Sequence, residues 1–280
     1  MFVVADMGST KTDWSFVDKN KNVVKLNTKG FNPYFYTTEE IIALLKPEFG
    51  NNPMNWEEIT NVYFYGSGCS SQQNQTIVKK ALSPFFPKAD IFISHDLLAS
   101  ARAVCGKNKG IACILGTGSN TCLYDGEKVV ANNPSLGFLL GDEGSGGDLG
   151  RELLKYYMYG ELPKEIEAQF EKQYDMNRDK LISEVYGTKH ANAYCAAFST
   201  FVNENKSNPV IKQLIEERMD EFFKRHVSKY EGYQSVPVNF IGSIAHYFEE
   251  NLKTVAKKHG ATVGIIIKNP VDKLIDFHYN

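Results

Sequence analysis

The chain has 280 residues, of which 42% are hydrophobic and 23% are charged, a composition typical of a globular protein with a sizeable core. The formal net charge is only -2 and no long run of Lys and Arg is present, so we expect neither nucleic acid nor a membrane as a partner. The five cysteines are an odd number without a Cys-x-x-Cys pair, which argues against a disulfide framework and favours the cytoplasm.

The first part of the chain alternates predicted strands and helices. We expect strands over 2–6, 12–18 and 22–28, joined by tight turns. A helix is predicted over 37–45, because Thr37 and Glu40 have the spacing of a capping box ahead of an apolar helical face. The other elements expected here are strands over 61–65 and 89–94 and helices over 72–82 and 96–104.

The second part restarts at Ile111, after the polar segment 106–110 that we expect to be the seam between two domains. An apolar strand comes first, and from about residue 149 to residue 230 the pattern is mostly helical, beginning with a helix near 149–159. The last predicted elements are strands over 236–242 and 262–267 and helices over 243–258 and 270–278. Strands that alternate with helices in both parts indicate an α/β fold with two lobes.

Segments 3–12 and 113–122 share one pattern, in which an apolar strand runs into a turn of Gly, Ser and Thr or Asn and then into a second strand. Such turns can aim several backbone N–H groups at a phosphate. Either turn alone is more simply an ordinary hairpin, but their duplication favours phosphate binding. Neither is a Gly-x-x-x-x-Gly-Lys-Ser/Thr loop or a dinucleotide motif, because strands rather than helices follow.

Two carboxylates stand at predicted strand ends. Asp6 precedes the first glycine turn, where a carboxylate beside a phosphate site could hold Mg²⁺; capping the turn is the alternative. Asp96 follows the strand over 89–94 and begins a helix, which suits a general base for a hydroxyl nucleophile; a plain helix N-cap is the alternative. Lys11 either adds positive charge to the phosphates or points to solvent.

The segment 141–147 places Asp142 and Glu143 among four glycines. This glycine density favours a surface that another molecule approaches closely, although acidic residues are also common at helix starts because of the helix dipole. Gly242 and Ser243 are a weaker signal, which could hold a nucleotide base or merely turn the chain.

Taken in order along nearly the whole chain, these motifs resemble the N-acetylglucosamine kinase-like branch of the BadF/BadG/BcrA/BcrD ATPase family, in the superfamily of actin, heat-shock ATPases and sugar kinases. The matching segments are Asp6-x-Gly-Ser-Thr-Lys-Thr12, Gly30-x-Asn32, Asp96, Gly116-Thr-Gly-Ser-Asn120, Gly141-Asp-Glu-Gly-Ser145, Gly242-Ser243 and a short C-terminal helix. The resemblance implies two ribonuclease-H-like lobes, 1–107 with 268–280 and 108–267, around a cleft for nucleotide and sugar.

The same resemblance implies a kinase that uses ATP and Mg²⁺ to phosphorylate an amino sugar, with N-acetylglucosamine 6-phosphate as the expected product. Asp96 would be the catalytic base and Asp6 the Mg²⁺ ligand. The residues implied to contact ATP are Gly8, Ser9, Thr10, Lys11, Gly116, Thr117, Gly118, Gly242 and Ser243. Those implied to contact the sugar are Asn32, Asp96, Ser119, Asn120, Gly137 and Asp142. Kinases of this superfamily are often dimers, so a homodimer is one expected state.

Several alternatives stay open. Where sugar kinases of this branch often have Gly-Trp-Gly, the chain has Ser135-Leu136-Gly137, so glucosamine, N-acetylmuramic acid or another hexose could be the substrate. An ATPase that activates a 2-hydroxyacyl-CoA dehydratase through an iron–sulfur cluster would need cysteines at cluster spacing, which Cys105, Cys113 and Cys122 do not have. A nucleotide or sugar sensor without turnover is the third possibility.

Overall fold

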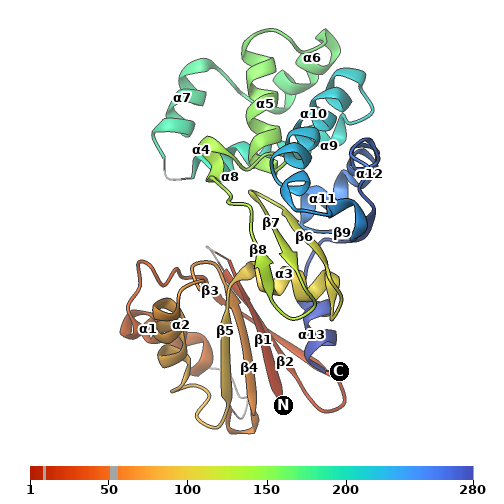
Figure 1. Ribbon diagram of the computed structural model, residues 1–280. Coiled ribbons are helices and arrows are strands. Elements are labelled where there is room, and N and C mark those ends of the chain that lie inside the picture. Colours follow the sequence, from red (N-terminus) through yellow and green to blue (C-terminus); the bar gives the residue numbers. More distant parts are fainter. Residues whose placement is uncertain (9–10, 51–55, 189, 280) are drawn as a thin grey trace. The chain divides into compact units, whose positions relative to one another are not determined.

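The computed structural model describes residues 1–8, 11–50, 56–188 and 190–279. The chain divides into two compact units, of which unit 1 comprises Met1–Gly106 with Pro270–Asn280 and unit 2 comprises Lys107–Asn269. Each unit is built around one five-stranded mixed sheet (Figure 1). The predicted α/β fold with two lobes is therefore confirmed.

Unit 1 contains five strands and the helices that cover them. Its strands are β1 (Phe2–Met7), β2 (Lys11–Val17), β3 (Val23–Lys29), β4 (Asn61–Gly66) and β5 (Asp90–Ser94). Its helices are α1 (Thr38–Gly50), η1 (Trp56–Glu58), α2 (Gln72–Leu82), α3 (Asp96–Cys105) and α13 (Val271–Tyr279). The strand order is β3-β2-β1-β4-β5, with β1 antiparallel to β2 and parallel to β4.

The two faces of this sheet carry different helices. Side chains alternate along β1, so that Val3 and Ala5 join a core with Trp14 of β2. Helices α1 and α2 lie over this face, while α3 and α13 lie against the other (Figure 1). The predicted capping box is present at the start of α1, where the Thr37 N–H donates to Glu40 Oε2 at 2.8 Å and the Glu40 N–H to Thr37 Oγ1 at 3.3 Å.

Unit 2 repeats the sheet of unit 1 and adds more helices. Its strands are β6 (Gly110–Leu115), β7 (Ser119–Tyr124), β8 (Val129–Ala131), β9 (Val238–Ile241) and β10 (Val263–Ile267). Its helices are α4 (Gly137–Leu140), α5 (Gly146–Met158), α6 (Lys164–Gln173), α7 (Arg178–Tyr186), α8 (Ala191–Ala197), α9 (Ser199–Glu204), α10 (Pro209–Arg225), η2 (Val227–Lys229), η3 (Tyr233–Ser235), α11 (Ser243–Tyr247) and α12 (Glu249–Lys258).

The sheet of unit 2 has the order β10-β9-β6-β7-β8, in which β6 is antiparallel to β7 and parallel to β9. In both sheets the first strand of the unit lies at the centre, the second and third strands lie on one side of it, and the fourth and fifth lie on the other. The repeat seen in segments 3–12 and 113–122 therefore extends to both whole sheets. Each repeated segment is the first hairpin of its sheet, and each glycine turn joins the sheet's central strand to its antiparallel neighbour.

Some element predictions were wrong in detail. The helix expected over 243–258 is two helices, because the chain leaves helical geometry at the buried Phe248. Helix α5 begins at Gly146, ahead of the expected start, because Ser145 caps it by accepting from the Asp148 N–H. Helix α4 and strand β8 were not predicted. None of the helices that the structure describes is long and apolar enough to cross a lipid bilayer.

The C-terminal helix α13 is fixed to unit 1 by His278. The imidazole stacks on Tyr63 with the ring centroids 3.6 Å apart, and its Nε2 atom lies 2.8 Å from the Tyr65 hydroxyl. That hydroxyl accepts a hydrogen bond from Arg102 of α3 at 2.7 Å, so it can donate its own proton to Nε2. Burial, aided by the nearby Arg102 charge, lowers the pKa of His278 to about 3.

This low pKa predicts that acid destabilises unit 1. The ordinary histidine pKa is 6.5, so below that pH an unfolded chain takes up a proton that the folded chain does not. The contribution of the neutral His278 imidazole to the stability of the fold is therefore complete above pH 6.5 and is lost as the pH falls towards 3. We expect His278→Phe, which keeps the stacking but cannot bind a proton, to lose less stability than the wild type between pH 7 and pH 5. Urea unfolding at the two pH values measures this, and equal losses would contradict it.

Candidate functional site

The predicted catalytic carboxylate, Asp96, is the first residue of α3, two residues after the end of β5. It is not the helix N-cap, because that position belongs to His95, whose ring accepts from the Leu98 N–H at 3.3 Å. Asp96 Oδ1 accepts from the Leu97 N–H at 2.9 Å, and Oδ2 accepts from the Ser67 hydroxyl at 3.1 Å. The carboxylate is therefore oriented by one backbone and one side-chain donor.

Asp6, the predicted Mg²⁺ ligand, lies near the end of β1 in the same unit. Burial, reinforced by the negative charges of Asp96 and Asp13, raises the pKa of Asp6 to about 6, and Lys11 opposes this only partly. The Lys11 ammonium is itself paired with Asp13 at 2.9 Å. A buried carboxylate close to another suits a divalent cation, because the cation would relieve the repulsion between them.

Asp6→Asn should stabilise the folded chain at neutral pH. With a folded pKa of about 6 against an ordinary 3.8, the carboxyl stabilises the fold fully below pH 3.8 and progressively less as the pH rises through 6. In the absence of divalent cations we expect the variant to gain about 2–3 kcal/mol in the free energy of unfolding at neutral pH. Urea unfolding near pH 4 and pH 7.5 tests this, and a variant that follows the wild type at both values would refute it.

Asn32 lies close to the segment that orients Asp96. Its Oδ1 atom accepts from the Tyr34 N–H at 3.0 Å. A Cβ atom on Gly68 would come within 2.6 Å of the same oxygen, so only glycine fits beside it, and Gly68 has the positive φ of 81° that glycine tolerates. Unit 1 thus brings Asn32 beside the Ser67–Gly68 turn and Asp6 near Asp96. Of the residues implied to contact ATP, Ser9 and Thr10 lie outside the described residues.

In unit 2, the second glycine turn is held against the start of α5. The Gly146 N–H donates to the Gly116 carbonyl at 2.8 Å and the Gly147 N–H to the Thr117 carbonyl at 3.0 Å. These contacts fix the backbone of the predicted phosphate-binding turn. Gly242, with a φ of 124°, passes so close to the Leu115 carbonyl that a side chain would collide with it. The end of β9 and Ser243, the first residue of α11, therefore lie beside the end of β6.

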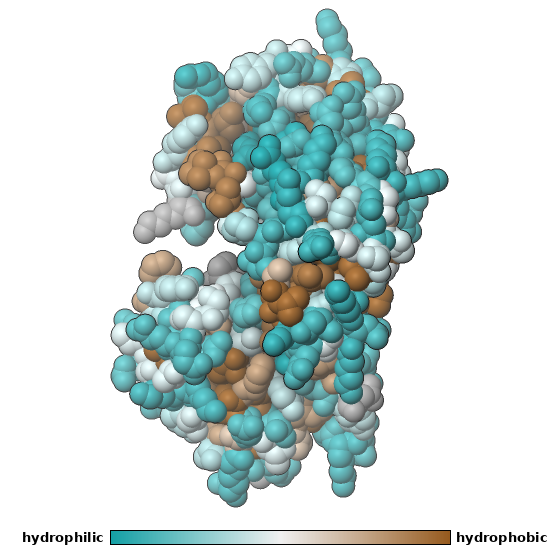
Figure 2. Space-filling model, viewed as in Figure 1, coloured by the Kyte–Doolittle hydropathy of each residue, from teal (hydrophilic) through white to brown (hydrophobic). Residues whose placement is uncertain are grey.

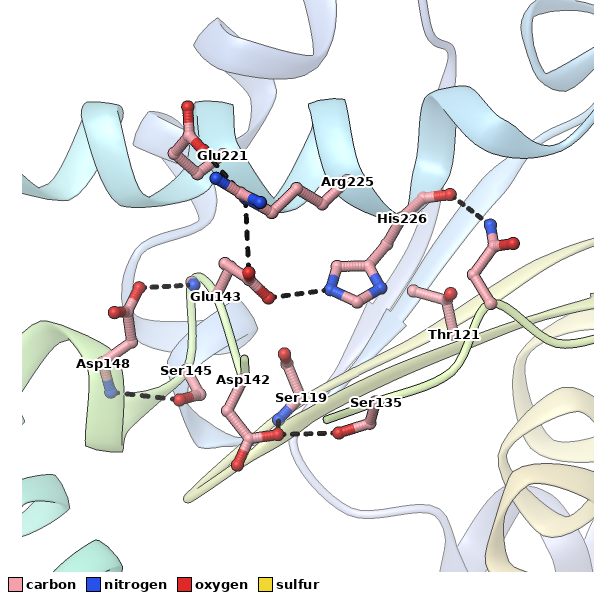
Figure 3. A network of polar contacts seen from close by, with 12 residues as sticks. Ser119, Thr121, Ser135, Asp142, Glu143, Ser145, Asp148, Glu221, Arg225 and His226 are labelled. Carbon is pink, nitrogen blue, oxygen red and sulfur yellow. Dashed lines mark hydrogen bonds and ion pairs between the residues drawn. The ribbon is translucent and has the colours of Figure 1, made fainter. Parts of the chain in front are cut away.

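Asp142 binds to this same turn (Figure 3). It is 6% exposed. Its Oδ1 atom accepts from the Ser135 hydroxyl at 2.8 Å and from the Ser119 N–H at 3.3 Å. A Cβ atom on Gly118 would lie 2.8 Å from Asp142 Oδ2. The Ser119 hydroxyl is buried and has no hydrogen-bond partner among the described residues. A buried hydroxyl beside a buried carboxylate is a suitable place for a ligand hydroxyl.

The other two predicted sugar contacts flank this pair. Asn120 Oδ1 accepts from the Thr121 N–H at 2.9 Å and from Asn132 Nδ2 at 3.0 Å. Gly137 has a φ of 71° and donates its N–H to the Ser135 hydroxyl at 3.3 Å, so it reaches Asp142 through Ser135.

Glu143, next to Asp142, faces the end of α10. Its Oε2 atom lies 3.0 Å from Nε2 of the buried His226, and Oε1 lies 3.3 Å from Nε of Arg225. Burial opposes ionisation of Glu143, but the hydrogen bond from His226 and the Arg225 charge together hold its pKa below the usual range. His226 carried no signal in the sequence beyond a basic residue near a helix end.

Sequence reasoning assigned no role in the candidate site to the side chains of Ser67, Ser135 and His226. A glycine–serine–glycine turn after a strand could have indicated Ser67, which precedes Gly68 at the end of β4. Hydrophobic side chains lie next to Ser135: Leu136, Leu139 and Leu140 are 61%, 80% and 76% exposed. Figure 2 shows the resulting hydrophobic surface over α4.

No group of three His, Cys, Asp or Glu residues placed to hold a metal ion occurs in the described ranges. A Mg²⁺ ion in a phosphoryl-transfer site commonly takes only one or two carboxylates and completes its shell with phosphates and water. Asp6, the predicted Mg²⁺ ligand, offers one such carboxylate.

A crystal structure from Porphyromonas gingivalis, of a protein described as an inferred N-acetylglucosamine kinase, is 37% identical to this chain with a TM-score of 0.92. The match covers 100% of this chain and 99% of that one. The chain belongs to the N-acetylglucosamine kinase-like family of sugar kinases. This family has the actin-like ATPase fold with two lobes, as expected from the sequence motifs.

Two further comparisons are weaker. The N-acetyl-D-glucosamine kinase of Dictyostelium discoideum is 23% identical over 172 residues, which are 56% of this chain and 54% of that protein, so the match spans about half of its length. A glucokinase from Streptomyces griseus, solved with glucose and the ATP analogue AMPPNP, shares the fold at 11% identity and a TM-score of 0.55, over 99% of this chain and 97% of that one. No family model matches the chain.

Proposed function

We propose that the chain catalyses the ATP-dependent phosphorylation of an amino sugar, with N-acetylglucosamine as the first candidate and its 6-phosphate as the product. The observation that carries this proposal is the full-length similarity to the Porphyromonas gingivalis protein. The described polar residues support it, because Asp6 and Asp96 lie near strand ends in unit 1 and Asp142 packs against the glycine turn after β6 in unit 2.

Asp96 is proposed as the general base. A positioned carboxylate can take the proton from the sugar hydroxyl as that oxygen attacks the γ-phosphorus of ATP. Phosphoryl transfer needs mainly positioning and charge stabilisation. The donors from Ser67 and the Leu97 backbone hold the Asp96 carboxylate in one orientation, which supports this role.

The sugar is proposed to bind at the buried polar pair of unit 2. Ser119 supplies an unpartnered hydroxyl within the described part of the chain, and Asp142 supplies a carboxylate whose Oδ1 atom is already held by Ser135. The exposed Leu136 offers an apolar surface for an acetamido methyl group in place of an aromatic ring. The other proposed sugar contacts are Asn32, Asn120 and Gly137.

ATP is proposed to bind along the two glycine turns. The proposed contacts are Gly8, Ser9, Thr10, Lys11, Gly116, Thr117, Gly118, Gly242 and Ser243. Asp6 would hold Mg²⁺, which when bound neutralises part of the phosphate charge. The tight backbone packing around Gly116, Thr117 and Gly242 supports a rigid surface that a phosphate or ribose can approach closely.

The iron–sulfur activator is less well supported. All five cysteines are buried, none with more than 8% exposure, so they present no accessible thiolate for a cluster shared between subunits.

The test is ADP release by the purified protein with Mg-ATP across a panel of sugars: N-acetylglucosamine, glucosamine, N-acetylmuramic acid, glucose and a blank without sugar. We expect N-acetylglucosamine to stimulate ADP release most. Stimulation by another amino sugar would support a sugar kinase with a different substrate. A rate of ADP release that no sugar alters would refute the proposed kinase activity.

A further inference from the structure

The loop that carries Asp142 is held by residues other than Ser119 and Asp142, the proposed sugar-binding pair. Asp142 and Glu143 are neighbours in sequence, yet their side chains leave the loop in different directions (Figure 3). Asp142 points toward Ser119 and Ser135, while Glu143 points toward the end of α10. One residue therefore contributes the carboxylate of the site and the next one anchors the loop.

The loop needs such an anchor because of its backbone. Asp142 has a φ of 57°, in the left-handed region that residues with a side chain rarely adopt. Such conformations persist only where surrounding contacts hold them. One contact is internal, from the Ser145 N–H to the Asp142 carbonyl at 3.1 Å. Asp148 Oδ2 also accepts from the Gly144 N–H at 2.9 Å, and the side chain of Glu143 ties the loop to the end of α10.

His226 is the buried partner of Glu143. Its side chain is 6% exposed, against 60% for Arg225, the other partner. Within the described residues, no group pairs with the Nδ1 atom of His226. The ring therefore makes its polar contact through Nε2, which donates to Glu143 Oε2 at 3.0 Å. A buried bond of this kind is worth more than the exposed pair with Arg225.

The same turn after α10 also holds the segment that leads to Ser135. The His226 carbonyl accepts from Asn133 Nδ2 at 2.6 Å, and the Asn133 N–H donates to the Tyr230 hydroxyl at 3.0 Å. That hydroxyl lies 2.8 Å from Thr121 Oγ1 on β7. The end of α10 and the turn after it thus hold two chain segments. One is the loop that carries Asp142, and the other leads to Ser135, whose hydroxyl donates to the Asp142 carboxylate.

We propose that His226 is a positioning residue for sugar binding, which acts through Glu143 to keep Asp142 in its left-handed conformation. It does not contact the sugar. This inference rests on the proposed function, because it assigns the Asp142 carboxylate to the sugar.

The test compares two substitutions at one position. His226→Gln keeps an N–H donor close to the place of Nε2, whereas His226→Leu keeps the bulk and removes the donor. We expect the Leu variant to raise the KM for the sugar roughly 10- to 100-fold while the KM for ATP stays within about twofold. We expect the Gln variant to recover most of the sugar affinity. Calorimetric titration of N-acetylglucosamine should give the same ranking without turnover.

The chain offers a matched control in His259. This residue donates to Asp220 of α10 at 2.7 Å and stacks on Phe223, much as His226 pairs with Glu143 beside Phe222. His259→Leu should lower stability without changing the KM for the sugar.

The outcomes separate the two claims. If wild-type protein phosphorylates the sugar and His226→Leu keeps a normal sugar KM, or if Gln is as damaging as Leu, the positioning role is wrong and the kinase stands. If the wild type neither binds nor phosphorylates any sugar in the panel, the proposed function fails and the inference fails with it.

Discussion

Asp96→Asn is expected to lower kcat for sugar phosphorylation by roughly 10²–10⁴-fold, the usual contribution of a positioned base. The amide is nearly the size of the carboxylate and can still accept from Ser67, so the start of α3 should keep its structure. The KM for the sugar should change by less than about fivefold. Steady-state kinetics with Mg-ATP and the best sugar of the panel measure both values.

Asp90→Asn is the matched control. Asp90 is the exposed first residue of β5, the strand that ends just before Asp96, and its substitution should leave kcat unchanged. An Asp96→Asn protein with full activity would remove the base from the proposed mechanism. A loss of sugar binding without a loss of kcat would make Asp96 a binding residue only.

Gly150→Ala is expected to destabilise unit 2 more than most single substitutions. Gly150 lies in α5, and a Cβ atom there would collide with the backbone carbonyl of Cys195 in α8. The obstacle is backbone, so the two helices would have to move apart, at a cost of about 3 kcal/mol. For a unit of this size we expect the midpoint of thermal unfolding to fall by roughly 5–10 °C.

Gly50→Ala provides the comparison. Gly50 ends α1, and among the described residues no heavy atom outside its own helix and chain neighbours lies within 4 Å of the position its Cβ would take. That substitution should change the unfolding midpoint by less than about 2 °C. If both variants unfold at the wild-type temperature, the close approach of α5 and α8 is not needed for stability.

The sequence predicted the parts of the fold that local patterns determine. Both hairpins follow from an apolar strand that runs into a glycine turn, and the capping box at Thr37 marks the start of α1 with local contacts alone. The break at Phe248 was not predictable in this way, since an apolar helical pattern continues on both sides of it. The packing of α11 on the sheet and of α12 on α10 decides that break.

The same distinction between local patterns and tertiary contacts applies to the candidate site. Asp6, Asp96 and Asp142 stand in short motifs, so the sequence could single them out. Their partners could not be found from spacing, because Ser67 lies 29 residues from Asp96 and His226 lies 83 residues from Glu143. Only the folded chain brings such pairs together. The roles of all of these residues in catalysis stay predictions.

The most direct test of the central claim is whether the γ-phosphoryl group of ATP appears on the sugar. Purified protein would be incubated with Mg-ATP and N-acetylglucosamine, and the products separated and identified by mass spectrometry and phosphorus NMR. We expect a sugar monophosphate, bonded at the primary hydroxyl, in the same amount as the ADP formed. ADP matched instead by inorganic phosphate, with the sugar unchanged, would contradict a sugar kinase and make the chain an ATPase of another kind.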